Sequence, residues 1–180
     1  MLFTELSLPG CYLLEPRVFQ DARGRFVKTF MRSVLEAKGL RGDFCEQYYS
    51  TSAPGVIRGM HFQTPPHDHA KLVYCASGAV TDVLLDLRKG LESYGGHVSL
   101  SLSAESGHMV YIPSGVAHGF VATQAPALLV YNVTSEHAPN HDAGVRWDSF
   151  GFAWPVGEPV ISDRDRAFQA FADYLSPFHS

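Results

Sequence analysis

Ala79-Val80-Thr81-Asp82-Val83-Leu84-Leu85-Asp86-Leu87 is mostly apolar, with polar side chains only at its third, fourth and eighth positions. A strand with one face in water alternates apolar and polar residues, whereas a strand covered on both faces reads as a nearly continuous apolar run. This stretch therefore predicts a strand near the centre of a sheet.

Short runs of aliphatic, β-branched and aromatic residues recur on either side of this strand, separated by Gly, Pro, Ser and Asp. They occupy residues 26–30, 44–50, 56–63, 72–75, 80–87, 98–102, 109–113 and 128–133. This rhythm is typical of an antiparallel sandwich or barrel. About eight strands in a chain of 180 residues predict an all-β fold, a double-stranded β-helix or jelly roll.

Two stretches predict short peripheral helices. Residues 33–39 end on a glycine suited to a helix C-cap, and residues 162–175 begin with Ser162 followed by Asp165, which resembles a capping box. In the second stretch Phe168, Phe171 and Leu175 form one apolar stripe.

Composition limits the classes of function. A chain of 180 residues predicts one domain over residues 1–180, and the formal charge of −4 argues against binding to nucleic acid or to a membrane surface. Cys11, Cys45 and Cys75 are odd in number and share no CxxC spacing, so we expect a reducing cytoplasm rather than a disulfide framework. No signal peptide or membrane span is recognisable in the sequence.

Gly55-Val56-Ile57-Arg58-Gly59-Met60-His61-Phe62-Gln63 places an arginine and a histidine three residues apart in a strand-like segment. Strict alternation would send the two side chains to opposite faces unless a bulge intervenes, and Gly59 lies between them. A strand with a cation and an imidazole on one face predicts the wall of a site for an anionic ligand. The alternative is a paired core histidine beside a surface arginine.

A metal site is a second alternative. His67-Asp68-His69 places two imidazoles on one face of an extended chain, and Gly107 to His118 resembles the second motif of metal-binding cupins. Lys71, however, lies where the first cupin motif carries a glutamate ligand, and a cation there repels a divalent metal. The ligand set is incomplete, so we expect no metal, but a metal-dependent cupin using His67, His69 and His118 stays open.

The ordered motifs together resemble the family of deoxythymidine-diphosphate-4-dehydrorhamnose 3,5-epimerases, which are enzymes of deoxysugar biosynthesis with a cupin jelly roll. The resemblance covers most of the chain. It is carried by residues 14–19, 21–24, 56–63, 71–73, 82–88, 102–105, 112–120 and 154–165.

The resemblance implies a catalytic set of four residues. His61 is the general base that removes a proton from the carbon beside the C4 ketone of the sugar, and Asp165 is its carboxylate partner. Tyr131 is the acid that returns a proton from the opposite face. Lys71 stabilises the enolate oxygen. Without the resemblance, Asp165 reads as a helix first-turn residue and Tyr131 as a packed aromatic.

The resemblance also implies a nucleotide site and a homodimer. Arg23 and Arg58 match positions that bind the diphosphate, with Arg23 serving the neighbouring subunit, and His118 lines the cavity. Glu46, Tyr48 and Lys28 replace family residues that hold the nucleotide, so the base, thymine, cytosine or guanine, stays open. The predicted substrate-binding residues are Arg23, Lys28, Glu46, Tyr48, Arg58, Gln63 and His118.

The sequence thus predicts an epimerase without cofactor that inverts C3, C5 or both on a nucleotide-diphosphate 4-keto-6-deoxy sugar. Three alternatives stay open: a 3,4-ketoisomerase on the same substrates, a metal-dependent cupin enzyme, and a non-catalytic sugar-nucleotide binding module.

Overall fold

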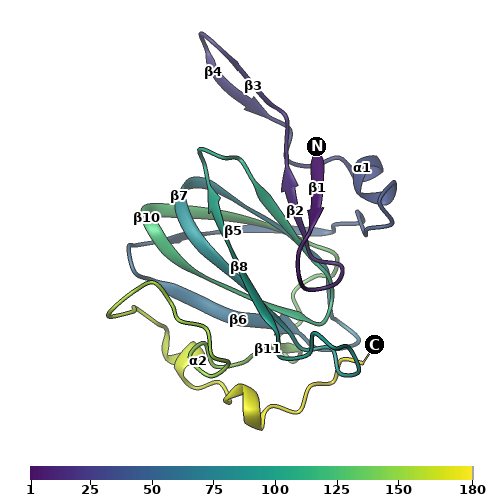
Figure 1. Ribbon diagram of the computed structural model, residues 1–180, viewed down its shortest axis with the longest axis vertical. Coiled ribbons are helices and arrows are strands. Elements are labelled where there is room, and N and C mark those ends of the chain that lie inside the picture. Colours follow the sequence, from purple (N-terminus) through teal and green to yellow (C-terminus); the bar gives the residue numbers. More distant parts are fainter. Residues whose placement is uncertain (180) are drawn as a thin grey trace.

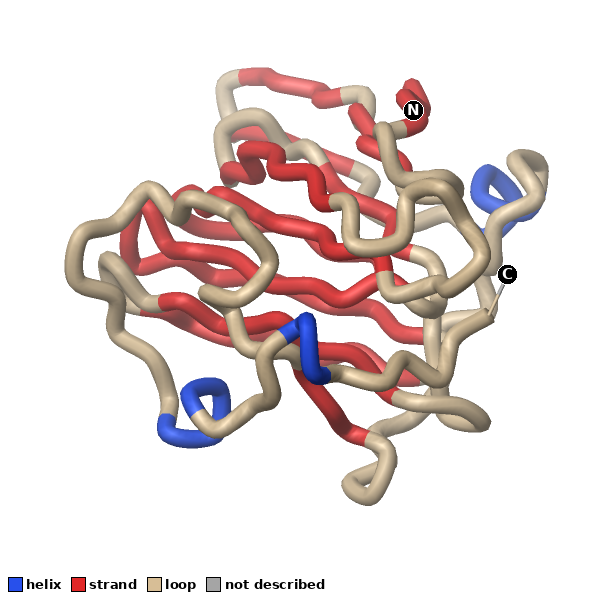
Figure 2. The backbone as a smooth tube through the Cα atoms, turned by 60° about the horizontal axis from the view of Figure 1, so that its bottom comes forward, coloured by secondary structure: helices blue, strands red, loops and turns tan. Residues whose placement is uncertain are grey.

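The computed structural model describes residues 1–179 and is built almost entirely of strands, with short helices at the periphery (Figures 1 and 2). The strands in this part of the chain are β1 (Leu2–Glu5), β2 (Tyr12–Glu15), β3 (Val18–Asp21), β4 (Gly24–Val27), β5 (Glu46–Ser52), β6 (Ile57–Gln63), β7 (Lys71–Asp86), β8 (His97–Ser103), β9 (Met109–Ile112), β10 (Val116–Val133) and β11 (Asp142–Gly144). The helices are α1 (Arg32–Glu36), α2 (Asp163–Arg166) and the 3-10 turn η1 (Phe171–Asp173).

Two long strands, β7 and β10, organise the jelly roll. They pair with each other in antiparallel fashion along most of their length. On its other edge β7 pairs first with β9 and then with β8, and β10 pairs first with β6 and then with β5. One layer is therefore β1-β2-β9-β7-β10-β5 and the other is β8-β7-β10-β6-β11, joined through the two long strands. The predicted all-β jelly roll is confirmed.

A glycine permits the bend at which β7 and β10 pass from one layer to the other. The register between these strands shifts between Ala122 and Leu128, opposite Gly78. Gly78 has a φ of +71°, and a Cβ there would overlap the carbonyl oxygen of Gln124. A residue with a side chain would thus oppose the bend both by conformation and by contact.

The predicted central strand is confirmed, because the second half of β7 lies between β8 and β10 and is largely buried. Residues 72–75 and 80–87, predicted as two strands, form one. The strand predicted over residues 26–30 lies earlier in the chain, as β4 ends at Val27. The strand predicted to begin at residue 128 is the end of β10, which begins twelve residues earlier. The largest core cluster fills the space between the layers with Val73, Val80, Leu84, Leu102, Val110, Phe120 and Leu129.

The predicted helix over 33–39 is present as α1, but the predicted helix over 162–175 is wrong. Ser162 does cap α2, accepting a hydrogen bond from the Asp165 amide, yet the helix ends after one turn. The backbone beyond it is committed elsewhere, since the Gln169 carbonyl accepts a hydrogen bond from the Arg146 amide. Leu175 of the supposed apolar stripe is 84% exposed.

Two segments lie outside the jelly roll (Figure 1). The β3–β4 ribbon projects from the body near α1, and the C-terminal segment, drawn in yellow, runs along the side of β6 and β11. This second segment brings α2 against β6. No helix among residues 1–179 is long and apolar enough to cross a membrane.

Candidate active site

A bulge in β6 places Arg58 and His61 on the wall of one cavity. His61 pairs with His118 of β10 while Arg58 pairs with Phe120, so two β6 residues, Gly59 and Met60, face a single residue of β10. A Cβ on Gly59 would lie 2.6 Å from the Gly119 Cα. The irregularity expected at Gly59 is confirmed, and it brings both functional side chains to the same side.

His61 forms a dyad with Asp165. The Nε2 atom of His61 lies 2.8 Å from Oδ1 of Asp165, whose Oδ2 accepts a hydrogen bond of 3.1 Å from the Gly59 amide. Burial alone would raise the pKa of Asp165, but its hydrogen bonds with His61, Gly59 and Ser162 hold that pKa below its ordinary value. The carboxylate is therefore ionised and only accepts, which places the imidazole proton on Nε2 and the lone pair on Nδ1.

Burial also tunes the imidazole. It lowers the pKa of His61, and the Asp165 carboxylate opposes that shift only in part. At neutral pH the ring is consequently neutral and able to accept a proton, which is the state that a general base requires.

Lys71 lies at the start of β7 and reaches across the site to β6. Its side chain is nearly fully buried, and Nζ donates a hydrogen bond of 3.1 Å to the His61 carbonyl. Burial lowers the pKa of Lys71 to about 8, although Asp142 and Asp82 raise it again in part. The group is still mostly protonated at pH 7 and supplies a cation near His61.

Tyr131 and Tyr48 are cross-strand partners on β10 and β5, and their rings stack at 4.8 Å with an interplanar angle of 16°. The Tyr131 hydroxyl lies 3.1 Å from Oγ of Ser50. Burial raises the pKa of Tyr131 above its ordinary value of 10 and that of Tyr48 to about 12. Both phenols therefore keep their protons and remain able to donate one.

His118 is held by a second buried carboxylate. Its Nε2 atom lies 2.7 Å from Oδ2 of Asp82, and both side chains are buried. Burial raises the pKa of Asp82, and the His118 ring partly opposes this. The His118 ring packs edge-on against Tyr131 at 5.9 Å, and both side chains line the same cavity.

These side chains line two adjoining cavities of about 330 and 180 Å³ that share Tyr48, His61 and Lys71. The smaller is also lined by Arg58, His118 and Tyr131, and the larger by Glu46, Gln63 and His69. A base, a protonated phenol, an ammonium group and a guanidinium thus surround one space. This set can remove a proton beside a carbonyl and return it elsewhere.

Comparison with known proteins agrees with this chemistry. The family model for dTDP-4-dehydrorhamnose 3,5-epimerase matches residues 5–173. The chain belongs to the dTDP-4-dehydrorhamnose 3,5-epimerase family. An enzyme of that name from Pseudomonas aeruginosa is 40% identical over 177 residues, which cover 96% of this chain and 97% of the relative. One from Shigella flexneri is 38% identical over 93% of this chain and 94% of its own.

Solved structures of this epimerase family have the same fold. The Legionella pneumophila enzyme in complex with dTDP-4-keto-L-rhamnose superimposes with a TM-score of 0.92 at 30% identity, covering 97% of this chain and 94% of that one. A 3'-monoepimerase from Streptomyces bikiniensis in complex with dTDP-quinovose gives a TM-score of 0.87 at 32% identity, covering 93% and 86%. The predicted family, cupin fold and isomerase class are confirmed, and the epimerase is favoured over the three alternatives.

Two predicted binding residues of the epimerase lie apart from the others. Arg23 is in the turn of the β3–β4 ribbon, where its side chain is 90% exposed and pairs with Asp21 at 2.6 Å. Lys28 follows the same ribbon and is exposed. Within one chain neither residue lines the cavities that contain His61.

The histidines weighed as metal ligands are not brought together. His67 packs its ring against His141 at 4.5 Å, whereas His118 is paired with the buried Asp82. Within the described residues 1–179, no group of three His, Cys, Asp or Glu side chains is arranged to hold a metal ion.

Several residues that shape the site were missed in the sequence. Phe168 packs edge-on against the His61 ring at 5.8 Å and occupies the space where a Cβ of Gly144 would lie. Arg164 of α2 bonds Asp142 of β11 at 2.8 Å and thereby ties the helix that carries Asp165 to the sheet. A glycine and an aromatic residue 24 positions apart give no periodic signal, so only the folded chain shows this contact.

Proposed function

We propose that this protein inverts C3, C5 or both on a nucleoside diphosphate 4-keto-6-deoxy sugar by proton transfer through an enolate. The observation that carries the proposal is the arrangement around one cavity of a carboxylate-paired imidazole, His61, a buried protonated phenol, Tyr131, and a buried ammonium group, Lys71. Family membership supports the same reaction.

The first step forms the enolate. Nδ1 of His61 takes the proton from the carbon beside the ketone. The electron pair of the broken C–H bond forms a C=C bond between that carbon and C4, and the C4 carbonyl oxygen becomes the enolate oxygen. Asp165 stabilises the resulting imidazolium through its hydrogen bond to Nε2. The ammonium group of Lys71 stabilises the negative charge that develops on the C4 oxygen.

The second step returns a proton to the opposite face of the same carbon. Tyr131 donates it, and its raised pKa ensures that the phenol still carries its proton at neutral pH. The carbonyl reforms, and the tyrosinate and imidazolium exchange protons with solvent to restore the enzyme. Electrons are neither gained nor lost, so the reaction requires no redox cofactor.

Substrate binding draws on Arg58 in the cavity wall and on the projecting ribbon. The guanidinium of Arg58 suits a diphosphate, which accepts two parallel hydrogen bonds from such a group. Phe19 and Phe26 of the ribbon are exposed, and burying these rings against a second copy of the chain would be favourable. We therefore propose a homodimer in which Arg23 reaches the partner subunit's site. We also propose that the enzyme acts in the cytoplasm.

The experiment that tests the reaction is NMR-monitored incorporation of deuterium from heavy water into thymidine-, cytidine- and guanosine-linked 4-keto-6-deoxy sugars. dTDP is tested first, because the related structures above contain dTDP-sugars. Exchange at C3 or C5 that persists in the presence of a chelator supports the proposal and identifies the nucleotide and the carbon. A folded protein that exchanges none of these protons contradicts it.

A further inference from the structure

His69 is a histidine of the larger cavity to which the reaction above assigns no role. It precedes Lys71 by two residues at the start of β7, and its ring lines the cavity together with those of His61 and Tyr48. Lys71, whose ammonium group the proposed reaction uses, lines the same cavity.

The side-chain amide of Gln63 has a fixed orientation. Its Oε1 accepts a hydrogen bond of 2.6 Å from the Ala138 amide, and its Nε2 donates one of 2.8 Å to the His67 carbonyl. A backbone N–H can only donate and a carbonyl can only accept. Turning the amide over would break both bonds, so an N–H group of Gln63 faces His69.

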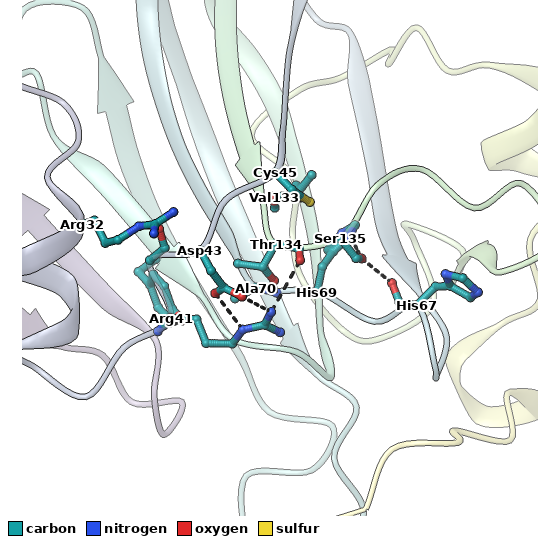
Figure 3. A network of polar contacts seen from close by, with 12 residues as sticks. Arg32, Arg41, Asp43, Cys45, His67, His69, Ala70, Val133, Thr134 and Ser135 are labelled. Atoms are coloured by element: carbon teal, nitrogen blue, oxygen red, sulfur yellow. Dashed lines mark hydrogen bonds and ion pairs between the residues drawn. The ribbon is translucent and has the colours of Figure 1, made fainter.

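The Nδ1 atom of His69 has a hydrogen-bond partner in either tautomer. Nε2 of Gln63 lies 3.2 Å from Nδ1 and can donate to it. The Ser135 hydroxyl donates to the His67 carbonyl at 2.7 Å (Figure 3), and its oxygen, 3.3 Å from Nδ1, can accept a proton from the ring. Nδ1 is therefore satisfied by the protein itself.

The Nε2 atom of His69 has no such partner. Burial lowers the pKa of His69 to about 3, so the ring is neutral. The Nε2 atom is buried and has no hydrogen-bond partner within the part of the chain that the structure describes. A buried unpaired polar atom is unfavourable, and here the surrounding loop is anchored, since Asp68 also bonds the Ser114 hydroxyl.

We propose that the Nε2 atom of His69 forms a hydrogen bond with a hydroxyl group of the sugar and so makes His69 a specificity-determining residue of this epimerase. The inference rests on the proposed function for the nature of the ligand. A neutral imidazole nitrogen suits a hydroxyl group, which can donate or accept, rather than the charged diphosphate.

The test compares binding of a nucleotide sugar with binding of its nucleotide alone. His69→Phe keeps an aromatic ring and removes both nitrogens, and His69→Gln keeps an N–H donor and adds a carbonyl acceptor. His97→Phe on β8 is a matched control outside the cavities. Calorimetry measures Kd for dTDP-, CDP- and GDP-linked 6-deoxyhexoses and for the corresponding nucleoside diphosphates, and thermal melting verifies the fold.

We expect His69→Phe to weaken binding of the nucleotide sugar about tenfold and that of the nucleoside diphosphate less than twofold. His69→Gln should recover most of the loss, and His97→Phe should change neither. Equal weakening of both ligands, no weakening of either, or no binding of any panel member would overturn the proposal. A wild-type protein that binds the sugar nucleotide but exchanges no sugar proton would refute the proposed function and leave the role of His69 to be decided by the same Kd values.

Discussion

Replacing Asp165 by Asn should nearly abolish proton transfer while preserving the fold. The Gly59 amide, which now donates to Oδ2, requires an acceptor in the variant, so the new amide must turn its oxygen toward Gly59 and its NH₂ toward His61. That NH₂ donates to Nε2 of the imidazole, which drives the ring proton to Nδ1. The atom that should accept the substrate proton then already carries one.

The magnitude follows from two losses. Turning the amide over would set two buried N–H groups against each other, at a cost of about 1–3 kcal/mol for each unsatisfied donor, so the unproductive tautomer dominates. The variant also lacks the negative charge that stabilises the imidazolium. In a serine protease triad the equivalent change costs about 10⁴-fold, so we expect a loss of 10³- to 10⁴-fold here, or about 4–5 kcal/mol in the barrier.

The assay is the initial rate of deuterium incorporation at C3 and C5, measured by NMR at saturating substrate. Asp163→Asn is the matched control. It removes a negative charge from the same turn of α2, but Asp163 is exposed whereas Asp165 is buried. It should retain nearly full activity. A rate for Asp165→Asn within tenfold of the wild type would refute the assignment of Asp165 as the residue that fixes the tautomer of His61.

Three further predictions concern the acid, the cation and the bulge. Tyr131→Phe should impair net inversion more than the first proton exchange, because the base survives; equal loss of both, measured on one NMR sample, would exclude a purely acid role. The value of kcat/KM should rise with pH as His61 deprotonates, with an apparent pKa below the ordinary 6.5, and should fall above about pH 8 as Lys71 deprotonates. Lys71→Met should remove the fall at alkaline pH and lower the rate about 10²- to 10³-fold. Gly59→Ala should destabilise the fold by about 1–3 kcal/mol in denaturant titration, since the new methyl group meets the backbone of β10, whereas Gly157→Ala, with open space around it, should change stability little.

The strands of the jelly roll could be predicted because each carries a local signal. The mostly apolar run 79–87 indicated a covered strand, and the structure places it between β8 and β10. Local signals failed where tertiary contacts determine the backbone. Residues 116–127 were not predicted as a strand, but pairing with both β6 and β7 makes them the first part of β10.

The C-terminal segment shows the same limit. The spacing of Phe168, Phe171 and Leu175 at i, i+3 and i+7 predicted one helix over 162–175. In the structure each of the two phenylalanine rings packs against a different aromatic residue. Phe168 packs against His61, and Phe171 packs against Tyr94 at 5.5 Å. A periodic pattern of apolar residues predicts that they are buried, but it does not show whether they all pack against the same surface.

The site could be predicted only as far as its residues act within one chain. His61 and Arg58 were recognisable because two ionisable residues flank a glycine in an apolar strand, and the bulge confirms that they share a cavity. Arg23 has no such context, since it lies in an exposed turn and pairs with its neighbour Asp21. Its predicted role depends on a second copy of the chain.

The central claim, that His61 is the base of an enolising epimerase, is tested most directly by deuterium incorporation into the nucleoside diphosphate 4-keto-6-deoxy sugar with His61→Ala beside the wild type. The account predicts exchange at C3 or C5 in the wild type and no exchange at any sugar carbon in the variant, with a cooperative thermal unfolding transition that shows the variant to be folded. A folded His61→Ala protein that retains most of the exchange rate would contradict it.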